Sequence, residues 1–92
     1  MEASEAARAL HDEIAASLDD EGEASSRLAV VSVEPPAHLG PDTHFTVTVE
    51  RESVRRRMEL PTGLAMAYLA DEEAAVDEWK SWVSRLRARF HD

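Results

Sequence analysis

The chain has 92 residues, 43% of them hydrophobic, and a formal net charge of −9. A chain of this length can form one small domain with a single core layer, which excludes a deep substrate cavity, so we expect one domain over residues 1–92. The absence of cysteine excludes a disulfide scaffold, a thiolate zinc site and a thiol nucleophile.

The start of the chain and its hydropathy bear on location. No apolar run reaches the roughly 18 residues that a membrane helix needs. The first residues, MEASEAARAL, begin with acid rather than base and contain no signal-peptide core. We therefore expect a cytoplasmic protein.

Residues 4–20 predict an amphipathic helix, because apolar residues recur at helical spacing with acidic residues opposite. The apolar stripe consists of Ala3, Ala7, Leu10, Ile14 and Leu18. Residues 1–26 hold eight acidic residues and one basic residue, a net charge of −7. Several of the acids crowd the C-terminal end of the helix, where its dipole disfavours anions. Helix stability does not explain this cluster, so it is either exposed only for solubility or a surface for a partner. The candidate partner contacts on this helix are Asp12, Glu13, Asp19, Asp20 and Glu21.

Residues 28–34 predict a strand, because they are rich in β-branched residues. Apolar residues occupy both faces of this strand, which favours a central position in a sheet over an edge. Pro35 and Pro36 end the strand, and residues 37–43 form a loop.

Residues 44–60 predict a β-hairpin with one apolar face. A tight turn centred on Arg51 and Glu52 keeps the apolar residues of both strands on that face. The predicted cross-strand pairs are Val49–Val54, Val47–Arg56 and Phe45–Met58.

The arginines of this hairpin are unusual in so acidic a chain. Arg55 and Arg57 are expected on the solvent face, beside Thr48 and Thr46, with Arg51 near them. Arg56 is expected to point towards the core and to extend its charge to water. The outward arginines protect an edge strand from pairing with other chains, or they form a binding patch.

Residues 60–70 allow two interpretations. The sequence LPTGL suits a hairpin turn with Gly63 in the left-handed conformation, followed by a fourth strand. The same residues allow Thr62 to cap a helix, which the alanine, methionine and leucine of residues 64–69 slightly favour.

Residues 71–90 predict a second amphipathic helix, with Asp71 as its N-cap and arginines in its last turn. Trp79 lies in the apolar stripe, and Trp82 lies at its margin, where a partner could contact it. The order of elements predicts an α+β fold. An antiparallel meander of three strands, or four if residues 64–69 are extended, carries both helices on one face.

No motif in the sequence predicts an enzyme, a cofactor or a metal site. Residues 38–44 contain His38, Asp42 and His44, but their spacing matches no established ligand pattern. Three scattered glycines form neither a P-loop nor a dinucleotide fingerprint, and no serine lies in a G-x-S-x-G elbow. The negative net charge and the lack of an exposed aromatic platform disfavour nucleic-acid binding.

These observations favour a non-catalytic acidic protein-binding module, an adaptor or an inhibitor, whose segregated charges orient a partner. A sharper version is an inhibitor that imitates a nucleic-acid backbone and blocks a basic groove. Small phage-encoded inhibitors such as anti-CRISPR proteins provide an analogy in size and charge. The alternative is a homo-oligomer in which the acidic helix of one protomer meets the arginine hairpin of another. The partner is thus another protein with a basic surface, or a second copy. The candidate contacts are Asp12, Glu13, Asp19, Asp20, Glu21, Arg51, Arg55, Arg57 and Trp82.

Overall fold

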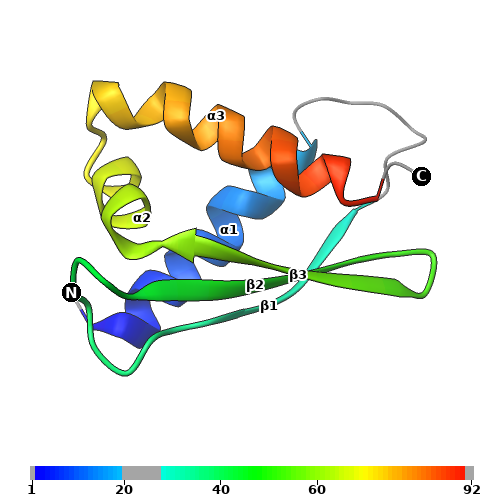
Figure 1. The fold of residues 1–92 in the computed structure, drawn as a ribbon, viewed down its shortest axis with the longest axis horizontal. Helices are drawn as coiled ribbons and strands as arrows, with labels where there is room; N and C mark the ends of the chain where they lie inside the picture. Colours follow the sequence, from blue (N-terminus) through cyan, green and yellow to red (C-terminus); the bar gives the residue numbers. More distant parts are fainter. Residues whose placement is uncertain (1, 20–27, 91–92) are drawn as a thin grey trace.

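The computed structural model describes residues 2–19 and 28–90, which form three helices and one sheet (Figure 1). The elements in chain order are α1 (Ala3–Asp19), β1 (Ala29–Glu34), β2 (His44–Arg51), β3 (Val54–Pro61), α2 (Thr62–Leu69) and α3 (Glu73–Ala88). The predicted α+β fold is confirmed, with three strands. Within the described ranges, no helix has the length and apolar character needed to cross a bilayer.

The sheet is antiparallel with the order β1-β2-β3, and the helices cover one of its faces (Figure 1). In β2, Phe45, Val47 and Val49 are fully buried, while the residues between them are at least partly exposed. These side chains belong to one hydrophobic cluster with α1, α2 and α3. The opposite face of the sheet carries polar side chains, as expected where one face of an antiparallel sheet meets water.

The hairpin turn lies one residue further along the chain than predicted. Glu52 and Ser53 are the central residues and have positive φ angles of 48° and 72°, the backbone of a type I′ turn. The observed pairs are Val49–Arg56, Val47–Met58 and Phe45–Leu60, so the predicted register is wrong by two residues. A slip of two residues leaves every side chain on its original face, so the predicted faces are correct.

β1 lies at an edge of the sheet, so the prediction of a central position is wrong. Its register shifts between Val30 and Ser32, which is a β-bulge. Because of this shift, Val30 and Val33 both face the core, opposite Val49 and Val47, and Val31 is 40% exposed. The bulge therefore explains the apolar residues that appeared on both faces.

The helical interpretation of residues 62–69 is correct, although Thr62 does not cap the helix. Its hydroxyl lies 2.8 Å from the hydroxyl of Thr43. The Thr43 hydroxyl donates its only proton to the oxygen of Gly40 at 2.7 Å, so Thr62 is the donor of the pair. This bond fixes the start of α2 to the loop before β2.

The chain turns between α2 and α3 at Asp71, which has a φ of 60°. Asp71 therefore lies outside α3, and the N-cap is Glu72, without a side-chain capping bond. The predicted capping role of Asp71 is wrong because the left-handed turn comes one residue before the cap.

Three contacts hold the C-terminal end of α1 against α3. Arg87 donates from Nη2 to the oxygens of Ser17 and Leu18 at 3.0 and 3.1 Å. The indole nitrogen of Trp79 donates to Ser17 Oγ at 3.0 Å. The last carbonyls of a helix have no partner within the helix and carry partial negative charge, so a guanidinium is well suited to them. The predicted stop at Gly22 lies outside the described residues.

Candidate protein-binding surface

The structure describes only some of the acidic residues that were predicted as partner contacts. The side chain of Asp12 is 86% exposed on α1, and Glu13 is half-buried. Arg8 is exposed one turn before Asp12, so α1 also carries a positive charge there. Asp19 ends α1, but its side chain lies outside the described part of the structure, as do Asp20 and Glu21.

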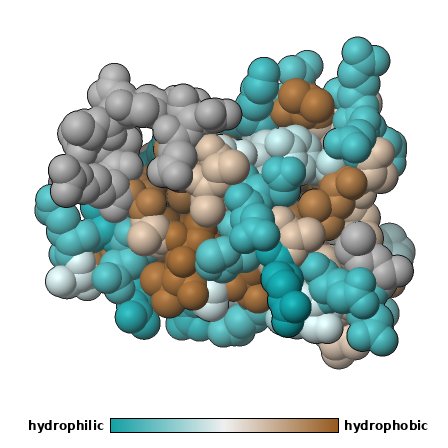
Figure 2. Space-filling view, turned by 180° about the vertical axis from the view of Figure 1, so that it is seen from behind, coloured by the Kyte–Doolittle hydropathy of each residue, from teal (hydrophilic) through white to brown (hydrophobic). Residues whose placement is uncertain are grey.

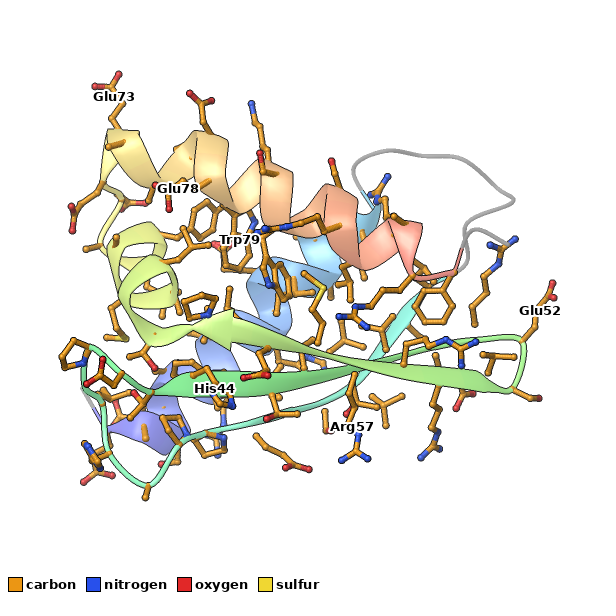
Figure 3. The ribbon with its side chains drawn as sticks, viewed as in Figure 1. His44, Glu52, Arg57, Glu73, Glu78 and Trp79 are labelled. Carbon is orange, nitrogen blue, oxygen red and sulfur yellow. The ribbon has the colours of Figure 1, made fainter. Side chains whose placement is uncertain are left out.

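Arg55 and Arg57 are both exposed, and their alternate positions in β3 place them on the open face of the sheet, as predicted. Figure 3 shows Arg57 pointing away from the helices. Their neighbours differ from the prediction because of the register. Arg55 lies opposite Glu50 and donates to its carboxylate at 2.7 Å, and Arg57 lies opposite Thr48. Arg55 is therefore partly neutralised within the sheet, whereas Arg57 makes no ion pair with any described residue.

Arg51 and Arg56 do not belong to this patch, because they occupy the other face of the hairpin. Arg51 is half-buried, and its Nη1 lies 3.4 Å from the oxygen of Phe90 at the end of α3. Arg56 lies opposite Val49 on this face but is itself exposed. The expectation that its charge reaches water is confirmed.

Trp82 is a core residue and not a surface contact. It is 1% exposed, and its indole nitrogen donates to the backbone oxygen of Glu59 at 2.9 Å. The sequence pattern placed it at the margin of the stripe because periodicity cannot show that β3 covers that margin. The neighbouring Trp79 lies between α2 and α3 (Figure 3) and stacks on Tyr68, with ring centroids 4.0 Å apart.

A groove between β3 and α3 is the main feature that the sequence did not predict. Its helical side is lined by Arg85, Ala88 and Arg89, and its strand side by Met58, Glu59 and Pro61. An adjoining hollow shares Met58, Glu59 and Arg89 with this groove and is also lined by Arg57 and His44. The only signal in the sequence was the spacing of Arg85 and Arg89, which places both on one side of a helix.

The hollows next to the groove differ in charge. His44 Nε2 lies 2.9 Å from Glu59 Oε2, so the acid that lines the same hollow as Arg57 already has a partner. Neither Arg85 nor Arg89 makes an ion pair with the described residues. A neighbouring hollow towards α2, which shares Pro61 and Arg85 with the groove, is lined by Asp77 and Glu78. The cationic part is called the arginine surface below and consists of Arg57, Arg85 and Arg89.

Exposed apolar side chains do not mark a second site on the described surface. Val31 and Val54 are the large hydrophobic residues that are exposed there, at 40% and 42%. On the side opposite to that of Figure 1, hydrophobic areas are broken up by hydrophilic side chains (Figure 2). Charge, and not exposed apolar area, is therefore what sets the arginine surface apart from the rest of the described surface.

The histidines do not form a metal centre with other described residues. His44 pairs with Glu59. The ring of His38 lies against Gly40, with its Cδ2 atom 3.2 Å from where a Cβ atom would be if Gly40 had one. Within residues 2–19 and 28–90, no three His, Asp or Glu side chains are grouped so that they could hold an ion.

The comparisons provide no relative: no protein-family model, curated protein or solved structure matches this chain.

Proposed function

We propose that this protein is a non-catalytic acidic protein-binding module, an adaptor or an inhibitor, that meets its partner through segregated charges. One observation carries the proposal: the two charged regions lie on opposite sides of the sheet. α1 packs on the covered face, whereas Arg55 and Arg57 stand on the open face. The sheet separates Asp12 and Glu13 on α1 from Arg57, which makes no ion pair with a described residue, so these charges are left to a partner.

The aromatic residues support a protein partner over a nucleic acid. All five are buried or half-buried: Phe45, Tyr68, Trp79, Trp82 and Phe90. None of them stands exposed as a platform on which bases could stack. The net charge of −9 also repels a nucleic-acid backbone. The narrower form of the proposal, an inhibitor whose acids imitate nucleic acid, concerns the acidic side of α1.

The same placement of charge supports the alternative, a homo-oligomer in which α1 of one copy meets the arginines of another. Sedimentation velocity at about 50 mM and 500 mM salt separates the two, because screening weakens contacts between exposed charges. A dimer that dissociates at high salt favours the homo-oligomer. A monomer under both conditions favours the binding module.

Affinity capture from the native host then tests the binding module directly. The baits are the wild-type chain, Arg57→Glu, and Lys80→Glu as a control with the same change of charge on the far side of α3. We expect one stoichiometric protein on the wild type and on Lys80→Glu, lost at high salt and depleted on Arg57→Glu. Equal capture by all three baits contradicts the proposal. So does the absence of any defined captured protein if sedimentation shows that the chain is a monomer.

A further inference from the structure

β3 is an edge strand, and part of its backbone faces away from the sheet. The oxygen of Glu59 points away from β2, since Trp82 on α3 donates to it. Backbone groups of alternate residues in a strand point to the same side, so those of Arg55 and Arg57 face outwards as well. The oxygen of Arg55 accepts a bond from the side chain of Arg56 at 3.3 Å, which agrees with this direction.

α3 covers only one end of this edge. Trp82 occupies the oxygen of Glu59, and the groove residues Ala88 and Arg89 follow along the last turns of the helix. Arg57 lies two residues closer to the hairpin turn than Glu59, so its outward backbone groups come next along the same edge. No described residue makes a hydrogen bond to the outward backbone groups of Arg57.

The side chains around the open edge determine what can pair with it. Arg57 and Arg89 line the hollow that adjoins the groove, from the strand and from the helix, and neither has an ion-pair partner among the described residues. A second copy that paired there in antiparallel fashion would place arginine clusters opposite one another, which is unfavourable. An acidic strand would instead be attracted to Arg57 and Arg89, because guanidinium groups bind carboxylates with directed hydrogen bonds.

We propose that the open edge of β3 binds an extended acidic segment of a partner protein, added as a fourth strand beside Val54–Met58. Its backbone pairs with the outward groups of Arg57, and its carboxylates lie against Arg57 and Arg89. Strand addition of this kind takes its affinity from the main chain and its specificity from alternate side chains. The inference rests on the proposed binding function and names the chemistry of the partner.

Fluorescence anisotropy with labelled heptapeptides tests the proposal. The first probe alternates glutamate and valine, the second replaces glutamate by lysine, and the third is the first probe with every backbone nitrogen methylated. We expect saturable binding of the first probe alone, weakened by salt. Methylation removes the donors of the added strand and should weaken binding at least about tenfold, whereas pure charge attraction would leave it unchanged.

Protein variants identify the edge that is used. Arg57→Glu and Arg89→Glu should each weaken the first probe about fivefold, and Lys80→Glu should bind as the wild type does. Arg57→Gln removes the charge with little change in size and should show an intermediate loss, with circular dichroism melts confirming that each variant is folded. Equal binding of the methylated probe, no effect of Arg57→Glu, or no binding of any probe overturns the inference. If the probes fail while the captured host protein still requires Arg57, the strand addition is wrong and the binding module stands.

Discussion

The indole nitrogen of Trp82 donates a 2.9 Å hydrogen bond to the backbone oxygen of Glu59, and this bond joins α3 to the outer edge of β3. The ring itself is 1% exposed. One side chain thus fills the core, closes one end of the exposed edge and fixes the distance between strand and helix on which the groove depends. The arginine surface exists because this contact holds Arg85 and Arg89 beside the strand that carries Arg57.

Replacing either tryptophan should therefore be costly. Trp82→Ala and Trp79→Ala should each lower the free energy of unfolding by about 3–5 kcal/mol, a large part of the stability of a small domain. From its position at the margin of the apolar stripe, the sequence alone would give Trp82 the smaller cost, but the structure buries both residues, at 2% exposure for Trp79 and 1% for Trp82. Urea denaturation measures both values, and a Trp82→Ala cost below half that of Trp79→Ala would contradict the burial argument.

The guanidinium of Arg87 should stabilise the C-terminal end of α1. Arg87→Leu removes two charge-assisted bonds to the oxygens of Ser17 and Leu18, and we expect a loss of about 1.5–3 kcal/mol. Arg87→Lys keeps the charge but not the position of the Nη2 donor, so its loss should be smaller than that of Arg87→Leu. Arg85→Leu, at an exposed position on the same helix, serves as the control and should change stability by less than about 0.5 kcal/mol. A loss for Arg85→Leu equal to that for Arg87→Leu would show that the contact with α1 is not the cause.

The hairpin turn carries a strain that a different sequence could relieve. Glu52 and Ser53 both have positive φ, a region that asparagine and glycine adopt at much lower cost. The double change Glu52→Asn and Ser53→Gly should raise the free energy of unfolding by about 1 kcal/mol. A thermal melt followed by circular dichroism measures the gain. If the melting temperature falls instead, the turn is not of type I′.

The register of the hairpin makes a prediction about its charges. Arg55 lies opposite Glu50, so Arg55→Glu should place two acids side by side and cost about 0.5–1 kcal/mol. Arg56 is exposed although it lies opposite Val49, so Arg56→Glu should cost less. The register predicted from the sequence would make Arg56→Glu the more costly change, because it places Arg56 against Val47 in the core and Arg55 beside Thr48. Melting temperatures of the two single variants decide between them.

Divalent metal ions should leave the stability unchanged. His38 and His44 face different neighbours, and His44 is paired with Glu59. We expect zinc or magnesium at a fewfold excess to leave the melting temperature within experimental error. A saturable rise that disappears in the double variant His38→Ala and His44→Ala would show that these residues bind metal after all.

The faces and most of the elements of this protein could be predicted from its sequence alone. Apolar residues recur with a period of two in strands and near 3.6 in helices, and the period determines which side chains point inwards wherever the chain is placed. Phe45, Val47 and Val49 were therefore correctly assigned to the core even though the register was wrong by two residues. Residues 64–69 were the exception, because a short run of alanine, methionine and leucine has no period that separates helix from strand.

Only the tertiary structure decided how the elements meet. The register depended on the positive φ angles of Glu52 and Ser53, and no residue typical of such turns marks them in the sequence. The apolar residues on both faces of β1 reflect a bulge at Val31 and not a central position in the sheet. The depth of Trp82 and the grouping of Arg57 with Arg89 depended on which strand lies beside α3. These are contacts between segments far apart in the chain, and a single sequence records the inward face of each segment but not its neighbour across the core.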